Sequence, residues 1–291
     1  MPQEIEIKLT VGADHLAEVE RWLAPRLSGG AAKPAGECPL LNRYFDTPDG
    51  QLNRARAALR VRQSGDRWIQ TLKTQGEYRN GAHRREEWEW PVSGPALDLS
   101  VLAGLPLADA VDLGQLDVVF ETNFRRRIWN LTESVAEVEM ALDSGLVLAG
   151  GRESPLNEVE FELKSGDPDV LHHLAGELAG SVPVLLNLVS KAEQGYHLAG
   201  IGAVARPERQ RSGEALSVAR WLDYLSQCWL LGALVALPTD RLAALSSAAD
   251  RAGVSDVWSE LAPLLAAGLS VPALLDAFPR LGQVQLALAR S

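Results

Sequence analysis

The chain has 291 residues, of which 46% are hydrophobic, so a packed core is expected and global disorder is excluded. Its formal net charge of −10 argues against a general binder of nucleic acids or anionic membranes. An anionic ligand would therefore need a local cluster of basic side chains. The two cysteines lie far apart and the N-terminus shows no signal peptide, so we expect a cytoplasmic protein without a disulfide framework.

The first two thirds of the chain are predicted to be mostly strands. After an N-terminal strand, Asp14 can cap a helix whose apolar side chains extend to Leu23, and a Gly- and Pro-rich connection follows over 28–39. A short helical stretch is predicted near 98–110, and a longer helix over 168–179. Further strand-like segments follow at residues 43–47, 58–62, 68–74, 84–91, 118–129, 135–142 and 158–165.

The last third of the chain has a different composition. Residues 201–213 are rich in Arg and contain Pro and Gly, which predicts a linker. Beyond this segment, Leu, Ala and Trp recur at helical spacing. The sequence therefore predicts an N-terminal domain over 1–200 and a C-terminal helical domain over 214–291.

The first strand carries an unusual charge pattern. Glu4, Glu6 and Lys8 alternate with apolar residues, so two carboxylates and an ammonium share one face of the strand. One such strand taken alone most simply faces water. The same alternation returns at Glu158–Lys164. Pairs of basic residues also share one strand face, at Arg60 and Arg62 and at Arg125 and Arg127.

A closed barrel with a polar interior explains these charged faces together. Apolar faces would then point outward under helices, while charges of both signs point inward and offset one another. Around eight strands is the number at which a barrel interior becomes just wide enough for side chains or a small ligand. The predicted class is α+β, with a closed eight-stranded antiparallel barrel, flanking helices and an all-α C-terminal region.

The ordered motifs resemble the CYTH domain family, the triphosphate tunnel metalloenzymes. Glu4-Ile-Glu6-Ile-Lys8 matches the ExExK signature of that family, and the resemblance covers roughly the first 200 residues. It continues in chain order through Tyr44-Phe45-Asp46-Thr47, Leu59-Arg60-Val61-Arg62, Thr71-Leu72-Lys73, Arg85-Glu86-Glu87-Trp88, Phe120–Arg125, Glu139–Asp143, Glu158–Glu162 and Ser190-Lys191-Ala192.

The resemblance implies a site for a triphosphate with Mg²⁺ or Mn²⁺, because hard divalent cations take oxygen ligands and basic side chains bind phosphate. Its implied metal ligands are Glu4, Glu6, Glu160 and Glu162, with Glu139 and Asp143 as weaker candidates. With Lys8, those four glutamates form the implied catalytic set. The implied phosphate-binding residues are Lys8, Arg60, Arg62, Lys73, Arg85, Arg125 and Lys191.

The leading function implied by this resemblance is metal-dependent hydrolysis of tripolyphosphate to pyrophosphate and phosphate. The enzyme alternatives are a class IV adenylyl cyclase and a nucleoside or thiamine triphosphatase. A polyphosphate- or nucleotide-binding module without activity is the alternative from another class. The C-terminal region resembles the start of a CHAD domain but is shorter, has no histidine after His197, and could mediate formation of a homodimer.

Overall fold

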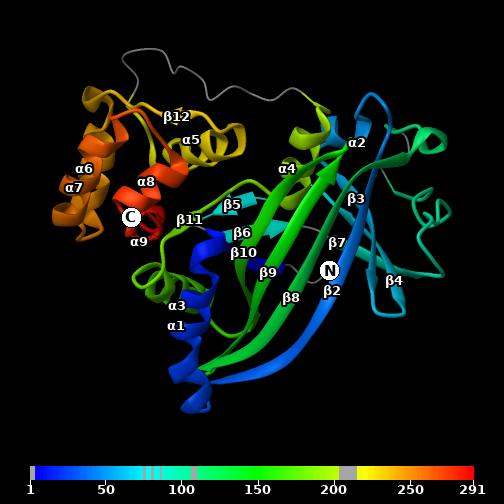
Figure 1. Cartoon of the computed structure of the whole chain (residues 1–291), viewed down its shortest axis with the longest axis horizontal. Helices are drawn as coiled ribbons and strands as arrows, with labels where there is room; N and C mark the ends of the chain where they lie inside the picture. Colours follow the sequence, from blue (N-terminus) through cyan, green and yellow to red (C-terminus); the bar gives the residue numbers. More distant parts are fainter. Residues whose placement is uncertain (1–3, 75–76, 80–81, 86, 106–109, 203–214) are drawn as a thin grey trace.

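The computed structural model describes residues 4–74, 77–79, 82–85, 87–105, 110–202 and 215–291, with the backbone alone for Glu4, 77–79 and 82–85. The chain is α+β, with one large antiparallel sheet and helices packed on it (Figure 1). In spatial order its strands are β5 (Glu77–Arg79), β6 (Ala82–Arg85), β1 (Glu4–Val11), β10 (Arg152–Ser165), β9 (Ala136–Ala149), β8 (Asp117–Glu133), β2 (Ala32–Asp46), β3 (Ala58–Ser64), β4 (Arg67–Lys73) and β7 (Glu87–Val92), and β11 (Val184–Leu186) also pairs with β1.

Helices lie on both faces of this sheet and form the C-terminal part of the chain. A two-stranded ribbon of β12 (Leu234–Val235) and β13 (Leu269–Ser270) lies among the C-terminal helices. The helices are α1 (Leu16–Ser28), α2 (Gln51–Arg54), α3 (Asp169–Ala179), α4 (Lys191–Ala199), α5 (Val218–Leu231), α6 (Ala243–Arg251), α7 (Ser255–Leu265), α8 (Val271–Ala277) and α9 (Leu281–Ala289).

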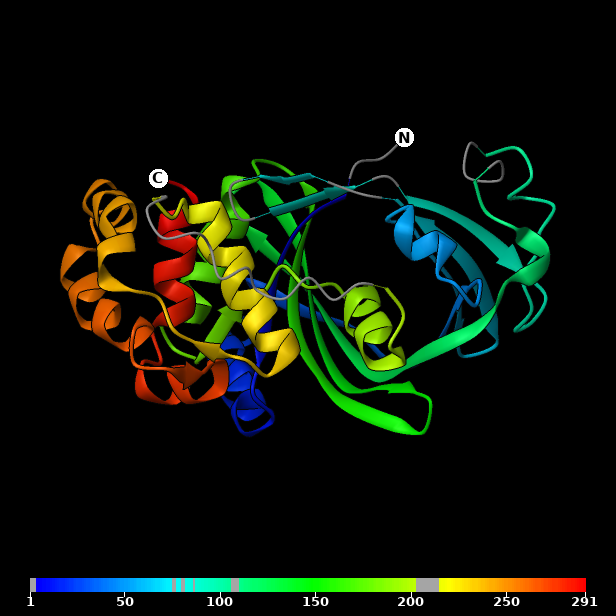
Figure 2. The same cartoon turned by 90° about the horizontal axis from the view of Figure 1, so that it is seen from above.

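The prediction of a closed eight-stranded barrel is wrong in both strand number and closure. The sheet has eleven strands among the described residues, and its hydrogen-bonded order remains open between its end strands, β5 and β7. The number rises because β5 is a short strand added at one edge and β11 a short strand paired with β1, and because the segment from β6 to β7 contributes two strands instead of one. Only one residue separates β6, the neighbour of the end strand β5, from β7 at the other end, so the sheet must curve strongly, as Figure 2 shows.

The two faces of the curved sheet differ in chemistry, as the alternation predicts. Ile7, Val159 and Phe161 point to the outer face and pack into one core with side chains of α1 and α3. Glu6, Lys8, Asp143, Glu158 and Thr71 are buried polar side chains at the alternate positions, which form the inner face.

The connection predicted over residues 28–39 is mostly part of a strand instead. β2 begins at Ala32 and pairs with β8 along its whole length, but it pairs with β3 only from Leu40 onward. Its Pro- and Gly-containing half is thus an edge strand, where a residue without an N–H donor is tolerated. The helix expected near 98–110 is also absent from the described residues there, since 98–105 form bends and turns.

The C-terminal helices continue the outer core. Trp221, Leu261 and Leu286 belong to the same hydrophobic cluster as Ile7 and Phe161. Figure 1 shows these helices gathered beside α3 at one side of the sheet. The predicted linker at 201–213 lies almost entirely outside the described residues. Within the described part of the chain, no helix is both long and apolar enough to cross a membrane.

Candidate functional site

Three carboxylates converge on the inner face of the sheet. Asp143 of β9 and Glu158 of β10 are cross-strand partners, and Glu160 follows two residues later on the same face. One oxygen of each residue lies within 4.8 Å of the others, a spacing at which a single cation could contact all three. Oxygen donors of this kind suit hard cations such as Mg²⁺. We call Asp143, Glu158 and Glu160 the carboxylate trio.

Two basic side chains are bound to the carboxylate trio. The Nζ atom of Lys191 lies 2.5 Å from Glu158 Oε2, 2.7 Å from Glu160 Oε1 and 3.0 Å from Asp143 Oδ2. Arg126 of β8 donates to both oxygens of Asp143 at 2.7 Å and also to Glu160. Lys8 of β1 is more distant, with its Nζ atom 3.7 Å from Glu158 Oε1.

The electrostatics of this cluster favour the charged forms of Glu160 and Lys191. Burial alone would raise the pKa of Glu160, but the charges of Lys191 and Arg126 hold that pKa well below its ordinary value. Burial alone would lower the pKa of Lys191, but Glu158, Glu160 and Asp143 raise it instead. Glu160 and Lys191 are therefore both charged at neutral pH.

A helix start positions Lys191. Ser190 caps α4: its hydroxyl accepts a hydrogen bond from the Glu193 backbone N–H at 3.1 Å, and the Glu193 carboxylate accepts from the Ser190 N–H at 2.7 Å. This capping box fixes Lys191 at the first position of the helix. The segment before the cap is tied to β1, because Lys8 Nζ donates to the Val189 carbonyl and Asn187 donates to Thr10 at 3.0 Å.

A basic wall continues the inner face beyond the trio. Arg60 and Arg62 alternate on β3, and Arg62 donates to the neutral amide oxygen of Asn42 at 2.7 Å. Burial, followed by repulsion from Arg60 and Arg126, lowers the pKa of Arg62 to about 9. The Nε–H of Arg60 is buried and has no hydrogen-bond partner among the described residues. Such a wall would be stabilised by a bound anion.

Tyr44 and a further ion pair lie next to this wall. Burial alone would raise the pKa of Tyr44, but Arg60 and Arg62 lower it. Farther along the sheet, Lys73 Nζ lies 2.7 Å from Glu87 Oε2, and Arg60 Nη2 lies 3.7 Å from Glu87 Oε1. The inner face therefore holds cations of β3 and β4 beside the acidic strands β9 and β10.

The structure brings together only part of the predicted site. Lys8, Arg60, Arg62, Lys191, Glu160 and Asp143 lie on the inner face, as do Lys73 and Glu6. Glu162 and Glu139 lie near one another but outside the trio, at 2.8 and 3.6 Å from Lys164 Nζ. The side chains of Glu4 and Arg85 lie outside the described residues.

Arg125 was assigned to the wrong face. Its side chain is 72% exposed and pairs with Glu37, while Arg127 lies 2.8 Å from Glu20 of α1. Arg126, which is not among the predicted site residues, is the arginine of this run that contacts the trio. Glu158 was likewise not selected as a metal ligand, although its alternation with Glu160 placed it on the same face.

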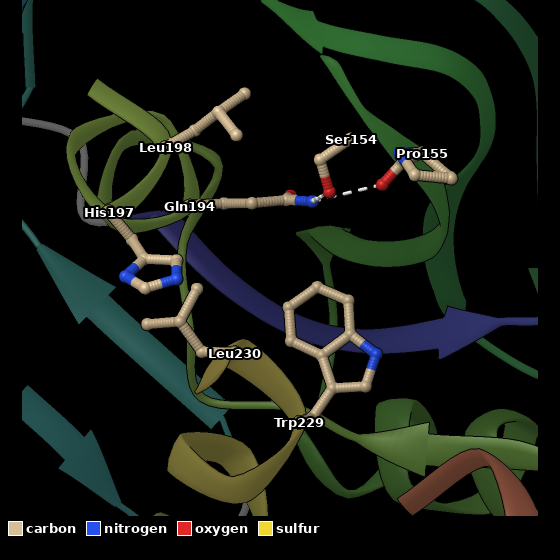
Figure 3. A pocket seen from close by; sticks show the side chains of 7 residues that line it. All are labelled: Ser154, Pro155, Gln194, His197, Leu198, Trp229 and Leu230. Atoms are coloured by element: carbon tan, nitrogen blue, oxygen red, sulfur yellow. Dashed lines mark hydrogen bonds between the residues drawn. The ribbon is translucent and has the colours of Figure 1, made fainter. Parts of the chain in front are cut away.

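A pocket of about 240 Å³ lies elsewhere, between β10, α4 and α5 (Figure 3). Gln194 crosses it and donates to Ser154 Oγ at 3.2 Å and to the Pro155 carbonyl at 2.9 Å. Trp229 and His197 form other parts of its wall, but no Asp, Glu, Lys or Arg is among the described residues that line it. It is therefore a poor match for a highly charged ligand.

Comparisons with known proteins agree with the predicted resemblance. The family model for the CYTH domain matches residues 2–196. The inorganic triphosphatase of Haemophilus influenzae is 32% identical over 199 residues, which are 68% of this chain and 55% of that protein. This chain thus spans little more than half the length of that curated relative.

Two solved structures are also similar to this chain. HpAC1 from Hippeastrum, a candidate adenylyl cyclase described as having a dominant triphosphatase activity, is 20% identical. The match covers 69% of this chain and 97% of that one, with a TM-score of 0.48. PH1012 from Pyrococcus horikoshii is 18% identical over 60% of this chain and 89% of that one, with a TM-score of 0.39.

Proposed function

We propose that this chain, which belongs to the CYTH domain family, hydrolyses tripolyphosphate to pyrophosphate and phosphate on the inner face of its sheet. The observation that carries the proposal is the adjacency of the carboxylate trio to the basic wall of Arg60 and Arg62. A short polyphosphate has closely spaced negative charges, which the basic wall can bind, and a cation held by the trio would neutralise further charge on the polyphosphate. The name of the relative, an inorganic triphosphatase, supports this choice of substrate.

The trio fits a hard divalent cation, Mg²⁺ or Mn²⁺, because all its donors are carboxylate oxygens and they converge within 4.8 Å. Asp143, Glu158 and Glu160 would hold the ion. Glu6 and Glu162 are cross-strand partners on the same face, and we propose that they extend this acidic set, together with Glu4. When bound, such a cation neutralises phosphate charge and makes a bound water more acidic.

The chain's own residues supply the rest of the chemistry. Arg60 and Arg62 can each present a planar pair of N–H donors to phosphate oxygens, whereas Lys8 and Lys73 act as point charges. These groups would orient the polyphosphate and stabilise the charge that develops on the leaving pyrophosphate. A glutamate of β10 could orient the attacking water and accept its proton.

Turnover by the purified full chain tests this proposal. The protein would be incubated with Mg²⁺ or Mn²⁺ and with tripolyphosphate, ATP or thiamine triphosphate, and the products would be separated. We expect phosphate and pyrophosphate from tripolyphosphate, with loss of turnover in Glu160→Gln. Glu153→Gln is the matched control, because Glu153 is an exposed residue of the same strand.

Other products would support the alternatives. Cyclic AMP as the main product from ATP would identify an adenylyl cyclase, and preferential hydrolysis of ATP or thiamine triphosphate would identify those substrates. Saturable binding of tripolyphosphate without any turnover would instead favour a binding module.

A further inference from the structure

The ammonium group of Lys191 occupies the point where the carboxylate trio converges. Its contacts of 2.5, 2.7 and 3.0 Å go to one oxygen from each of Glu158, Glu160 and Asp143. An ammonium has three N–H donors, so one lysine can satisfy all three acceptors at once. Arg126 contacts the trio from β8, with two hydrogen bonds to Asp143 and one to Glu160.

A divalent cation bound by the same three residues would need the same place. Mg²⁺ binds oxygen at about 2.0–2.1 Å. One oxygen from each residue of the trio lies within 4.8 Å of the others. An ion in contact with all three oxygens would lie close to the position of Lys191 Nζ, where two positive centres repel strongly at low dielectric. The ion and the Lys191 ammonium therefore compete for the trio.

Lys191 is able to leave the trio without disturbing the backbone. The capping box at Ser190 and Glu193 fixes the start of α4, whereas the lysine side chain is a flexible four-carbon stem. Burial alone would raise the pKa of Tyr44, but Arg60, Arg62 and, to a smaller extent, Lys191 lower it. Lys191 and the basic wall therefore act on the same phenol.

We propose that Lys191 is an exchangeable counterion, which neutralises the carboxylate trio until a divalent cation binds there and then turns to the phosphate chain of the ligand. This inference rests on the proposed function and states that Lys191 binds the carboxylates first and the phosphate chain afterwards. Because Lys191 opposes the cation but assists the polyphosphate, each ligand strengthens the binding of the other. The coupling is reciprocal, as it must be for two binding equilibria.

The first test measures Mn²⁺ affinity of the full chain by titration calorimetry without polyphosphate. Lys191→Gln should bind Mn²⁺ about tenfold more tightly than the wild type, a coupling within the usual range between sites. Lys191→Arg keeps the charge and should stay near the wild-type affinity. Lys33→Gln is the matched control, because Lys33 is an exposed residue of β2 outside the proposed site.

The second test uses the wild-type protein and does not depend on the folding of a variant. Brief acetylation followed by mass spectrometry should label Lys191 faster at saturating Mn²⁺, because its amine has left the three carboxylates. Lys33, an exposed lysine of β2, serves as the internal reference, and its labelling should not change. Unchanged labelling of Lys191, or a Lys191→Gln protein that binds Mn²⁺ no more tightly than the wild type, would overturn the exchange.

Neither measurement requires turnover, so the two proposals can fail separately. If both effects are seen but tripolyphosphate is not hydrolysed, the exchange is supported and the proposed activity is contradicted. If tripolyphosphate is hydrolysed but Lys191 shows neither effect, the activity is supported and the exchange is contradicted.

Discussion

Arg126 and Asp143 face each other across β8 and β9, and the guanidinium donates one hydrogen bond of 2.7 Å to each carboxylate oxygen. The Asp143 side chain is fully buried, while that of Arg126 is 16% exposed. A bidentate pair of this kind fixes the direction of both side chains. Arg126 thereby holds one member of the carboxylate trio in place while it also contacts a second, Glu160.

Replacement of Arg126 should therefore impair turnover far more than replacement of its neighbour. We expect Arg126→Ala to lower kcat for tripolyphosphate by about 10- to 100-fold, the usual loss when a partner that orients a metal-binding carboxylate is removed. Arg125→Ala should stay within about twofold, because the Arg125 side chain is on the other face and largely exposed. Steady-state phosphate release measures both. Equal losses in the two variants would contradict the assignment of the inner face.

Asp143 should matter for stability as well as for activity. Asp143→Asn removes the negative partner of two buried cations, and the lost charged hydrogen bonds should lower the free energy of unfolding by about 1.5–3 kcal/mol. Urea denaturation followed by circular dichroism measures this change. Asp66→Asn, at an exposed turn between β3 and β4, is the control and should leave the midpoint unchanged. An equally stable Asp143→Asn protein would mean that the pair contributes no net stability.

The lowered pKa of Glu160 predicts a specific pH dependence of the free energy of unfolding. Its folded pKa lies well below the value of 4.5 expected for an unfolded chain, so the folded state binds fewer protons. The stabilisation is complete above that unfolded value and is lost as the pH falls through the folded pKa. The difference in unfolding free energy between the wild type and Glu160→Gln should therefore be constant near neutrality and shrink below pH 4.5. A difference that stays constant into acid would contradict the lowered pKa.

Gln285 of α9 joins the C-terminal helices to the sheet. Its amide accepts a hydrogen bond from the Leu186 N–H at 2.8 Å and donates to the Leu186 carbonyl at 3.2 Å. Because both backbone groups would lose a buried partner, Gln285→Ala should cost about 1–3 kcal/mol of stability in urea denaturation. Gln283→Ala, at an exposed position of the same helix, should cost little. Similar costs for the two would show that these hydrogen bonds are not important.

The alternation of charged and apolar residues was sufficient to predict that charged side chains share one face of the sheet, but only part of the predicted site comes together there. It could not decide which face each arginine of the run 125–127 occupies, because a shift of one residue exchanges the faces. That choice is made by pairing with β2 and β9, where Arg126 lies opposite Cys38 and Asp143. The position of Glu158 opposite Asp143 likewise depends on partner strands and not on local sequence.

The strand number was harder to predict for a different reason. β5 and β11 have three residues each, too few for a periodic pattern to be recognised. The Pro- and Gly-rich start of β2 has a composition typical of a connection, and it is a strand only because β8 is long enough to pair with it. The predicted domain limits, the homodimer and the choice of metal stay predictions.

The hydrophobic core that crosses from the sheet into α5–α9 affects how this protein can be divided or recombined. The family match ends at residue 196, but Trp221 and Leu286 pack in the same cluster as Ile7. A chimera that contained only the family segment would expose apolar side chains of α3 and β11. It would also lack Gln285, which forms hydrogen bonds with the Leu186 backbone. In this protein the segment that matches the family is shorter than the segment that shares one core. A chimera between relatives should therefore include the C-terminal helices together with the sheet.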